Sequence, residues 1–156
     1  DTGNANVATT TDVFYAGGDV NQGRDPNVVH HAYDRNVAGT LATQLHAIDT
    51  RLDVLVRQAN NAGTLTTVGA LGIDASDLGG FDIGAGDEAY AVFADLGGGF
   101  SRLYRIDLAS GQASALGIIG ATVSGVAVAP IPLPAALPLF SLALAGLYAG
   151  HRRQRV

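Results

Sequence analysis

The stretch that decides the fold runs from residue 79 to residue 120 and reads GGFDIGAGDEAYAVFADLGGGFSRLYRIDLASGQASALGIIG. Short segments rich in aromatic and aliphatic residues alternate there with GAGDE, LGGG and ASGQ, whose Gly, Asp and Ser residues favour turns. The pattern predicts four strands with no helix between them, at residues 80–83, 89–95, 101–107 and 113–117.

The same pattern continues toward the N-terminus and as far as residue 130. It predicts further strands at residues 12–16, 28–33, 43–49, 53–58, 65–69 and 123–129. Short strands at roughly 8–12-residue spacing are typical of an all-β sandwich, barrel or propeller. No long segment before residue 131 has the 3.6-residue periodicity of a helix.

The sequence also contains an internal echo. QLHAIDT at 44–50 resembles RLYRIDL at 102–108, and each is followed by a strand ending in Gly and then by a Gly-led strand. With the insertion RLDVLVRQANNAG set aside, the period is roughly 40 residues, which is typical of propeller blades. We therefore expect a mainly β, propeller-like set of repeated antiparallel meanders, partial and of about three blades. The alternative is two unrelated hairpins that use common strand residues.

Charge and cysteine content exclude two classes of function. The chain has a formal charge of −5, and setting aside the three arginines of its last six residues leaves −8 for residues 1–150. An acidic chain is a poor partner for nucleic acid, whose phosphates need a cationic surface. The chain has no cysteine, so it has no disulfides and no thiol chemistry.

The last 26 residues, IPLPAALPLFSLALAGLYAGHRRQRV (131–156), differ sharply from the rest. Residues 135–150 carry no charge and are predicted to form one transmembrane helix of about 24 Å, short for a bilayer unless its flanks contribute. The basic tip at 151–156 holds Arg152, Arg153 and Arg155, which by the positive-inside rule orient the C-terminus toward the cytoplasm. The alternative is a buried C-terminal core helix.

The order of these parts, a proline motif, an apolar run and an arginine tip, closely resembles the PEP-CTERM class of bacterial sorting signals in its Val-Pro-Leu-Pro-Ala variant. The motif here is Ile131 followed by Pro132, Leu133, Pro134 and Ala135. The resemblance implies export by an N-terminal signal and retention in the inner membrane with residues 1–130 outside the cytoplasm. Cleavage near the motif by the membrane protease exosortase, and passage to the cell surface or extracellular matrix, are then expected. Since DTGNANVATTTDVF at the start does not read as a signal peptide, a preceding segment is also expected.

The body carries a second resemblance. The stretches YAGGDVNQGRDPNV, LHAIDTRLDVLVRQ, GTLTTVGALGIDA, GGFDI and LYRIDLASGQASALG are similar to a domain-of-unknown-function family of secreted bacterial proteins. The resemblance implies a propeller-like architecture, of which this chain matches the later half. That family has no established reaction, so the resemblance bears on architecture and not on chemistry.

One loop has the pattern of a cation site. Oxygen donors at alternate positions suit a hard cation such as Ca²⁺, and they form D-x-N-x-G-x-D at Asp19, Asn21, Gly23 and Asp25. An EF-hand loop needs Gly at its sixth position and Glu at its twelfth. The sequence has Arg24 and His30 there, so a polar turn-forming loop is the alternative.

The histidines give a weaker signal. His30, His31 and Asp34 could form a metal site or a base with an orienting carboxylate, but neighbouring side chains on a strand point to opposite faces. His46 occupies the position of Tyr104 in the echo, which predicts a structural, half-buried side chain.

Asp49 and Asp107 each precede a turn and are predicted to cap it rather than to form a catalytic pair. Ser101, Ser110 and Ser124 lack the sequence context of a catalytic nucleophile. With no recognisable catalytic set and no cofactor motif, we expect a non-enzymatic scaffold or binding protein of unknown ligand, with the bilayer and an exosortase as partners. The alternative is an extracellular hydrolase whose site lies in the channel of a propeller.

Overall fold

The computed structural model describes residues 12–59, 62–95 and 97–129. These residues form nine β-strands and no helix, so the prediction of a mainly β body is confirmed. In chain order the strands are β1 (Phe14–Tyr15), β2 (Val28–Tyr33), β3 (Leu45–Asp49), β4 (Val54–Gln58), β5 (Thr64–Ala70), β6 (Gly79–Ile83), β7 (Ala89–Asp95), β8 (Phe100–Ile106) and β9 (Ala113–Ile119).

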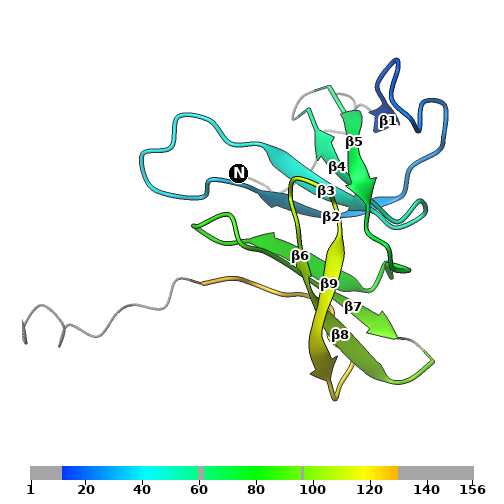
Figure 1. The fold of residues 1–156 in the computed structure, drawn as a ribbon, viewed down its shortest axis with the longest axis vertical. Helices are drawn as coiled ribbons and strands as arrows, with labels where there is room; N and C mark the ends of the chain where they lie inside the picture. The colour runs from blue at the N-terminus through cyan, green and yellow to red at the C-terminus, as the bar shows by residue number, and fades with distance from the viewer. Residues whose placement is uncertain (1–11, 60–61, 96, 130–156) are drawn as a thin grey trace, which may run out of the picture.

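The strands form two sheets (Figure 1). The first sheet has the order β1-β5-β4-β3-β2, in which β2 to β5 make an antiparallel meander and β1 joins β5 in parallel. The second sheet is an antiparallel meander with the order β6-β7-β8-β9. The body therefore repeats one unit, a four-stranded meander, whose first strands begin at Val28 and Gly79.

This arrangement corrects two details of the expected repeat. LHAID lies in β3, the second strand of its meander, whereas RLYRI lies in β8, the third strand of the other, so the echo joins strands that are not equivalent. The described residues contain two complete meanders rather than about three. Each meander spans just over 40 residues, 28–70 and 79–119, which is close to the predicted period of roughly 40. A third meander is not completed, because the described residues before Val28 contribute only the short β1 and those after Ile119 form no strand.

The two sheets pack face to face over one hydrophobic core. Ile48 and Leu55 of the first sheet meet Phe81, Phe93 and Ile106 of the second, and all five are nearly or fully buried. Strand β2 packs beside β6, which brings the first strands of the two meanders together. The opposite face of the first sheet is also covered, by a second cluster made of Tyr15, Ala47, Val54, Val56 and Leu65. Burial on both faces explains why β3 has no alternation of exposed and buried residues.

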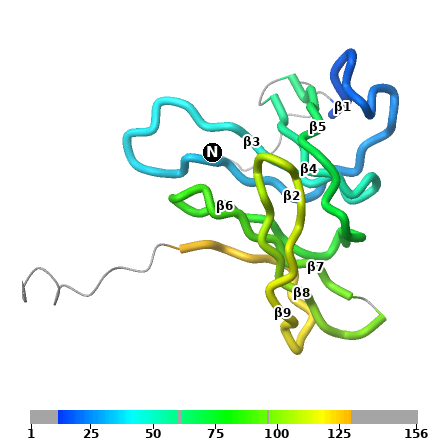
Figure 2. The backbone as a smooth tube through the Cα atoms, viewed as in Figure 1, coloured from blue at the N-terminus to red at the C-terminus, as the bar shows by residue number. Residues whose placement is uncertain are grey.

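The segment at 123–129 was predicted to be a strand, and the structure corrects this. The segment runs along the second sheet near β6 (orange in Figure 2) without joining a strand ladder among the described residues. Its backbone N–H groups donate to side chains instead: Val123 to Ser101 Oγ at 2.9 Å, and Val128 to Asp82 Oδ2 at 2.6 Å. Gly80 allows this close approach, since a Cβ there would lie 2.7 Å from Gly125 Cα.

The predicted membrane helix at 135–150, the motif Pro132, Leu133, Pro134 and Ala135, and the arginines Arg152, Arg153 and Arg155 lie outside the described residues. Within the described ranges, no helix is long and apolar enough to span a bilayer.

Candidate functional site

The candidate site is a polar hollow of about 590 Å³ in which residues of both sheets meet. The first meander contributes the connection between β2 and β3 and one side chain each of β3 and β4, and the second contributes the turns after β6 and β8. Its polar wall comprises Asp34, Arg35, His46, Arg57, Asp87 and Asp107. We name this hollow the inter-sheet groove.

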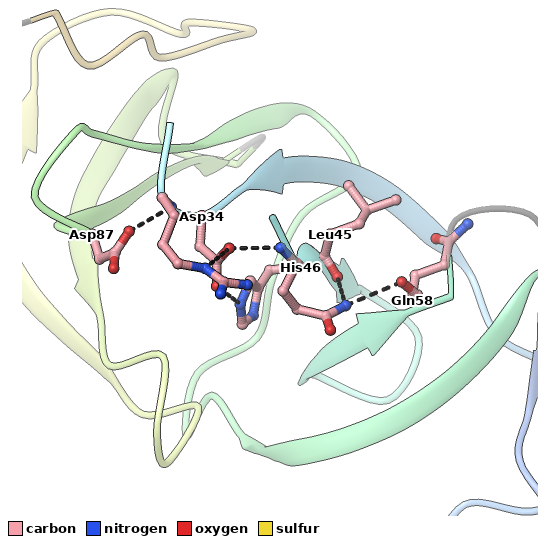
Figure 3. A network of polar contacts seen from close by, with 7 residues as sticks. Asp34, Leu45, His46, Gln58 and Asp87 are labelled. Atoms are coloured by element: carbon pink, nitrogen blue, oxygen red, sulfur yellow. Dashed lines mark hydrogen bonds and ion pairs between the residues drawn. The ribbon is translucent and has the colours of Figure 1, made fainter. Parts of the chain in front are cut away.

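An aspartate–histidine pair lies at the base of the groove (Figure 3). His46 Nε2 is 3.4 Å from Asp34 Oδ2. The β2–β3 hairpin creates the pair, because its register places Ala32 opposite His46 and Tyr33 opposite Leu45. Asp34 then follows β2 on the same face as His46, as a diagonal neighbour across the hairpin.

His46 is deeply buried, with 3% of its surface exposed. Burial lowers the pKa of His46 below its usual value, and the hydrogen bond to Asp34 opposes that shift. A neutral ring that donates from Nε2 to Asp34 leaves Nδ1 as an acceptor, and Nδ1 has no hydrogen-bond partner among the described residues. An unsatisfied buried polar atom costs roughly 1–3 kcal/mol, so this position is not optimised for stability alone.

Asp34 also ties the hairpin together. Its Oδ1 accepts the backbone N–H of Gln44 at 2.6 Å and Nε of Arg35 at 3.1 Å. Burial raises the pKa of Asp34, but the bonds from Gln44, Arg35 and His46 together bring it below its usual value. Asp34 is therefore ionised at neutral pH, and its two oxygens already have donors.

A single hydrogen bond joins the two sheets at the rim of the groove. Asp87 Oδ1 accepts the backbone N–H of Arg35 at 2.6 Å (Figure 3). Both residues have left-handed backbone conformations, with φ of 50° at Arg35 and 61° at Asp87. Non-glycine residues with positive φ are uncommon and cluster where the surrounding structure requires them. The contact fixes the β2–β3 connection against the turn between β6 and β7.

Two charged groups in the wall retain binding capacity. The guanidinium of Arg57 projects from exposed surface and makes no hydrogen bond or ion pair with another described residue. Asp107 Oδ1 accepts the N–H groups of Ala109 at 2.8 Å and Ser110 at 3.2 Å, which lowers the pKa of Asp107. The Asp107 carboxylate is thus ionised at neutral pH, and it is exposed in the wall of the groove.

The groove continues into two neighbouring hollows. A hollow of about 250 Å³ shares Gln44 and Arg57 with it and extends over β4 and β5. A hollow of about 390 Å³ shares Asp87 and Asp107 and extends to Arg105 and Ser114 on β8 and β9. Each outer hollow adjoins the groove, so the surface is elongated rather than a single compact pocket.

The described wall residues differ in the chemistry that they provide. The wall of the inter-sheet groove contains no serine, threonine, tyrosine or cysteine that His46 could activate as a nucleophile. His46 is also held below the surface. What the described wall offers a ligand is the guanidinium of Arg57 and carboxylate oxygens.

The other predicted histidines do not meet in one site. His30 is buried, its Nε2 lies 3.0 Å from the Ser76 carbonyl oxygen, and its ring packs against Phe93. His31 points to the opposite, exposed face, with Nε2 3.1 Å from Gln58 Oε1. The prediction that these neighbours face apart is confirmed. Asp34 pairs with His46 instead, which the sequence reasoning missed; counting residues across the hairpin was the one signal for that pair.

The residues of the predicted cation loop have different partners. Asp19 accepts hydrogen bonds from the N–H and hydroxyl of Thr67, both at 2.7 Å, and from the Asn21 N–H at 2.9 Å. Asp25 instead forms an exposed ion pair with Arg51. Gly23 has a φ of 80°, as a turn requires. Asp19 thus anchors the loop to β5, and no group of three His, Asp or Glu side chains in the described ranges could hold a metal ion.

The predicted capping roles of the two turn aspartates are confirmed. Asp107 caps the turn after β8 as described above, and Asp49 Oδ1 accepts the N–H groups of Arg51 at 2.9 Å and Leu52 at 3.2 Å. Ser101 is fully buried, and its hydroxyl serves the backbone of Val123. Each of these side chains therefore has a structural partner.

Comparison with protein families gives one clear result. The model of the domain of unknown function DUF4394 matches residues 1–128. No curated protein matches the chain, and no solved structure matches it. The match covers both meanders and the segment that runs along the second sheet, which is most of the chain. The chain therefore belongs to the DUF4394 family.

Proposed function

We propose that this protein is an exported, non-enzymatic scaffold or binding protein of the bacterial envelope, and that the inter-sheet groove is its ligand site. It is held in the inner membrane by the helix at 135–150 with its β domain outside the cytoplasm. An exosortase-type protease then cuts near Pro134 and Ala135 and passes the domain to the cell surface or extracellular matrix. The proposed localisation rests on the order of the proline motif, the apolar run and the arginine tip.

The binding role is supported by how the polar side chains are used. The carboxylates of Asp19, Asp34 and Asp49 are occupied by hydrogen bonds within the fold. Arg57 is a cation without a partner in the described residues, and it faces a groove that lacks a nucleophile. A rigid β scaffold that presents unpaired polar groups in a groove is suited to hold a ligand.

We further propose that the two meanders are successive blades of a propeller-like arrangement. Strand β6 lies between β2 on one side and residues 124–128 on the other. In a propeller the first strands of successive blades neighbour one another around the axis. Residues 123–129 would then be the first strand of a further unit.

The proposed localisation is tested by cell fractionation. The full chain is fused to a bacterial signal peptide and expressed in a host with an exosortase and in a host without one. We expect membrane retention in the second host and release of the β domain in the first. Replacement of Arg152, Arg153 and Arg155 with Glu should impair retention, whereas replacement with Lys, which keeps the charge, should not. Equal fractionation of the Glu and Lys variants would contradict the proposal.

A second candidate function is an extracellular hydrolase, and the His46–Asp34 pair is the observation that favours it. The full chain should be assayed against esters, lactones and glycans. Turnover that disappears in His46→Gln would establish the hydrolase and end the non-enzymatic interpretation. No turnover, or turnover equal in the variant, would support a binding protein.

A further inference from the structure

The geometry points to a specific ligand class for the inter-sheet groove: we propose that it and its two adjoining hollows bind a linear, hydroxyl-rich oligosaccharide that carries carboxylates, such as a polyuronate. This inference rests on the proposed binding function and names its ligand chemistry.

Arg57 provides a free cation at the junction of two hollows. Arg57 lines both the main hollow and the hollow over β4 and β5, at the point where the two join. Its guanidinium has no partner among the described residues. A planar guanidinium pairs best with a carboxylate, which it can contact through two parallel N–H···O bonds. A carboxylate on the ligand is therefore expected beside Arg57.

Two aspartates in the wall provide hydrogen-bond acceptors. Asp107 and Asp87 line both the main hollow and the hollow over β8 and β9, and each uses only Oδ1 for its hydrogen bonds within the described residues. Their Oδ2 atoms can accept from a ligand, and an ionised carboxylate is acceptor-only. A ligand that supplies O–H donors satisfies them, whereas another carboxylate would be repelled. The ligand thus needs hydroxyls as well as an acid group.

The three hollows form a row. The hollows have volumes of about 250, 590 and 390 Å³, and each outer hollow shares two wall residues with the middle one. Gln58, Thr64 and Thr66 continue the polar wall at one end, and Arg105, Gln112 and Ser114 continue it at the other. A row of open hollows suits a chain of similar units better than a single compact molecule.

Nucleic acids and peptides fit these hollows less well. Arg35, Arg57 and Arg105 are balanced along the hollows by Asp34, Asp87 and Asp107. A single-stranded nucleic acid binds by stacking its bases on aromatic side chains, and the described wall residues of the three hollows include no Phe, Tyr or Trp. An acidic peptide would supply the carboxylate for Arg57 but few hydroxyl donors for Asp87 and Asp107, whereas each sugar unit carries several.

The test is isothermal titration calorimetry of the full chain in detergent with four probes of matched length: a galacturonate tetramer, a neutral glucose tetramer, a glutamate tetrapeptide and a DNA tetranucleotide. We expect the galacturonate to bind at least tenfold tighter than the other three. Its binding should also weaken as salt is raised, because an exposed ion pair is screened.

Two groove variants and one control locate the site. Arg57→Gln should weaken galacturonate binding at least tenfold, and Asp107→Asn should weaken it while keeping the oxygen that caps the turn. Arg102→Gln is the matched control, since Arg102 lies over the Phe100 ring beside a separate hollow; it should change affinity less than twofold. Circular dichroism melts of all variants must agree with that of the parent chain.

Each other outcome overturns the inference. Equal binding of the glucose tetramer removes the role of charge, and equal binding of the glutamate peptide removes the role of hydroxyls. Equal or tighter binding of DNA assigns the surface to nucleic acid. Absence of galacturonate binding, or equal losses in Arg57→Gln and Arg102→Gln, removes the ligand class or the site. None of these results bears on the fractionation experiment, so the proposed localisation is tested independently of the ligand.

Discussion

Tyr15→Phe tests whether one buried hydrogen bond holds the N-terminal strand to the sheet. The Tyr15 hydroxyl donates to Asp49 Oδ2 at 2.6 Å, and Asp49 has no exposed surface. Asp49 Oδ1 meanwhile accepts three backbone N–H groups, from Asn27, Arg51 and Leu52. Burial, together with the Asp49 bond, raises the pKa of Tyr15, so the phenol remains a donor throughout the ordinary pH range.

The expected magnitude follows from what remains after the substitution. Phe keeps the buried ring but leaves Asp49 Oδ2 without its donor. A hydrogen bond to a charged group contributes about 1.5–3 kcal/mol, and an unsatisfied buried acceptor costs a similar amount. We expect the free energy of unfolding to fall by about 2 kcal/mol. For a chain of this size that corresponds to a midpoint lower by about 4–8 °C.

The measurement is urea and thermal unfolding of the full chain in detergent, followed by far-ultraviolet circular dichroism. Tyr33→Phe is the matched control, because Tyr33 is 43% exposed and its hydroxyl has no hydrogen bond with another described residue. The control should change stability by less than about 0.5 kcal/mol, as most surface substitutions do. A Tyr15→Phe variant as stable as Tyr33→Phe would refute the reasoning.

Three further predictions use the same unfolding assays. Gly80→Ala places a Cβ 2.7 Å from the backbone of Gly125 and should lower the free energy of unfolding by about 1–3 kcal/mol. Gly117→Ala is the control, because a Cβ there has nothing within 4 Å and should change stability little. Equal losses in the two variants would argue against the packing of residues 123–129 on β6. Burial lowers the pKa of folded His46, so its stabilising contribution is complete above the unfolded pKa of about 6.5 and is lost as the pH falls toward the folded pKa. His46→Gln should therefore flatten the fall in stability between pH 7 and 5, leaving the part due to His31, whose pKa burial also lowers; an unchanged slope would remove His46 as the cause. Asp19→Ala removes the bonds to Thr67 and should lower the free energy of unfolding by about 1–3 kcal/mol. Asp25→Ala removes only an exposed ion pair and should lower it by less than about 1 kcal/mol. A larger loss in Asp25→Ala than in Asp19→Ala would contradict the anchoring role of Asp19.

The local features of this fold could be predicted from the sequence because they depend on neighbouring residues. Asp49 and Asp107 cap turns by accepting N–H groups two and three residues further along the chain. Adjacent His30 and His31 face apart because successive side chains on a strand alternate. The strands β2, β7 and β8 were located closely for the same reason, since runs of strand-forming residues end there at turn sequences.

Only the tertiary structure decided which segments meet. Residues 123–129 have the composition of a strand, but they join no ladder in the described fold. The N–H groups of Val123 and Val128 donate to the side chains of Ser101 and Asp82 instead. The echo of LHAID and RLYRI was misleading about position, because similar strand sequences serve equally well in the second and third places of a meander. Sequence similarity between strands does not specify their order in a sheet.

The candidate site shows the same division. That Asp34, His46 and Arg57 are polar was evident from the sequence, but Asp34 reaches His46 only through the register of a hairpin with a long connection. Asp87 and Asp107 join them only because the two sheets pack over a shared core of Ile48, Phe81 and other buried side chains. Hydrogen bonds within a turn follow from local geometry. A groove between sheets exists only after hydrophobic burial has brought the two meanders together.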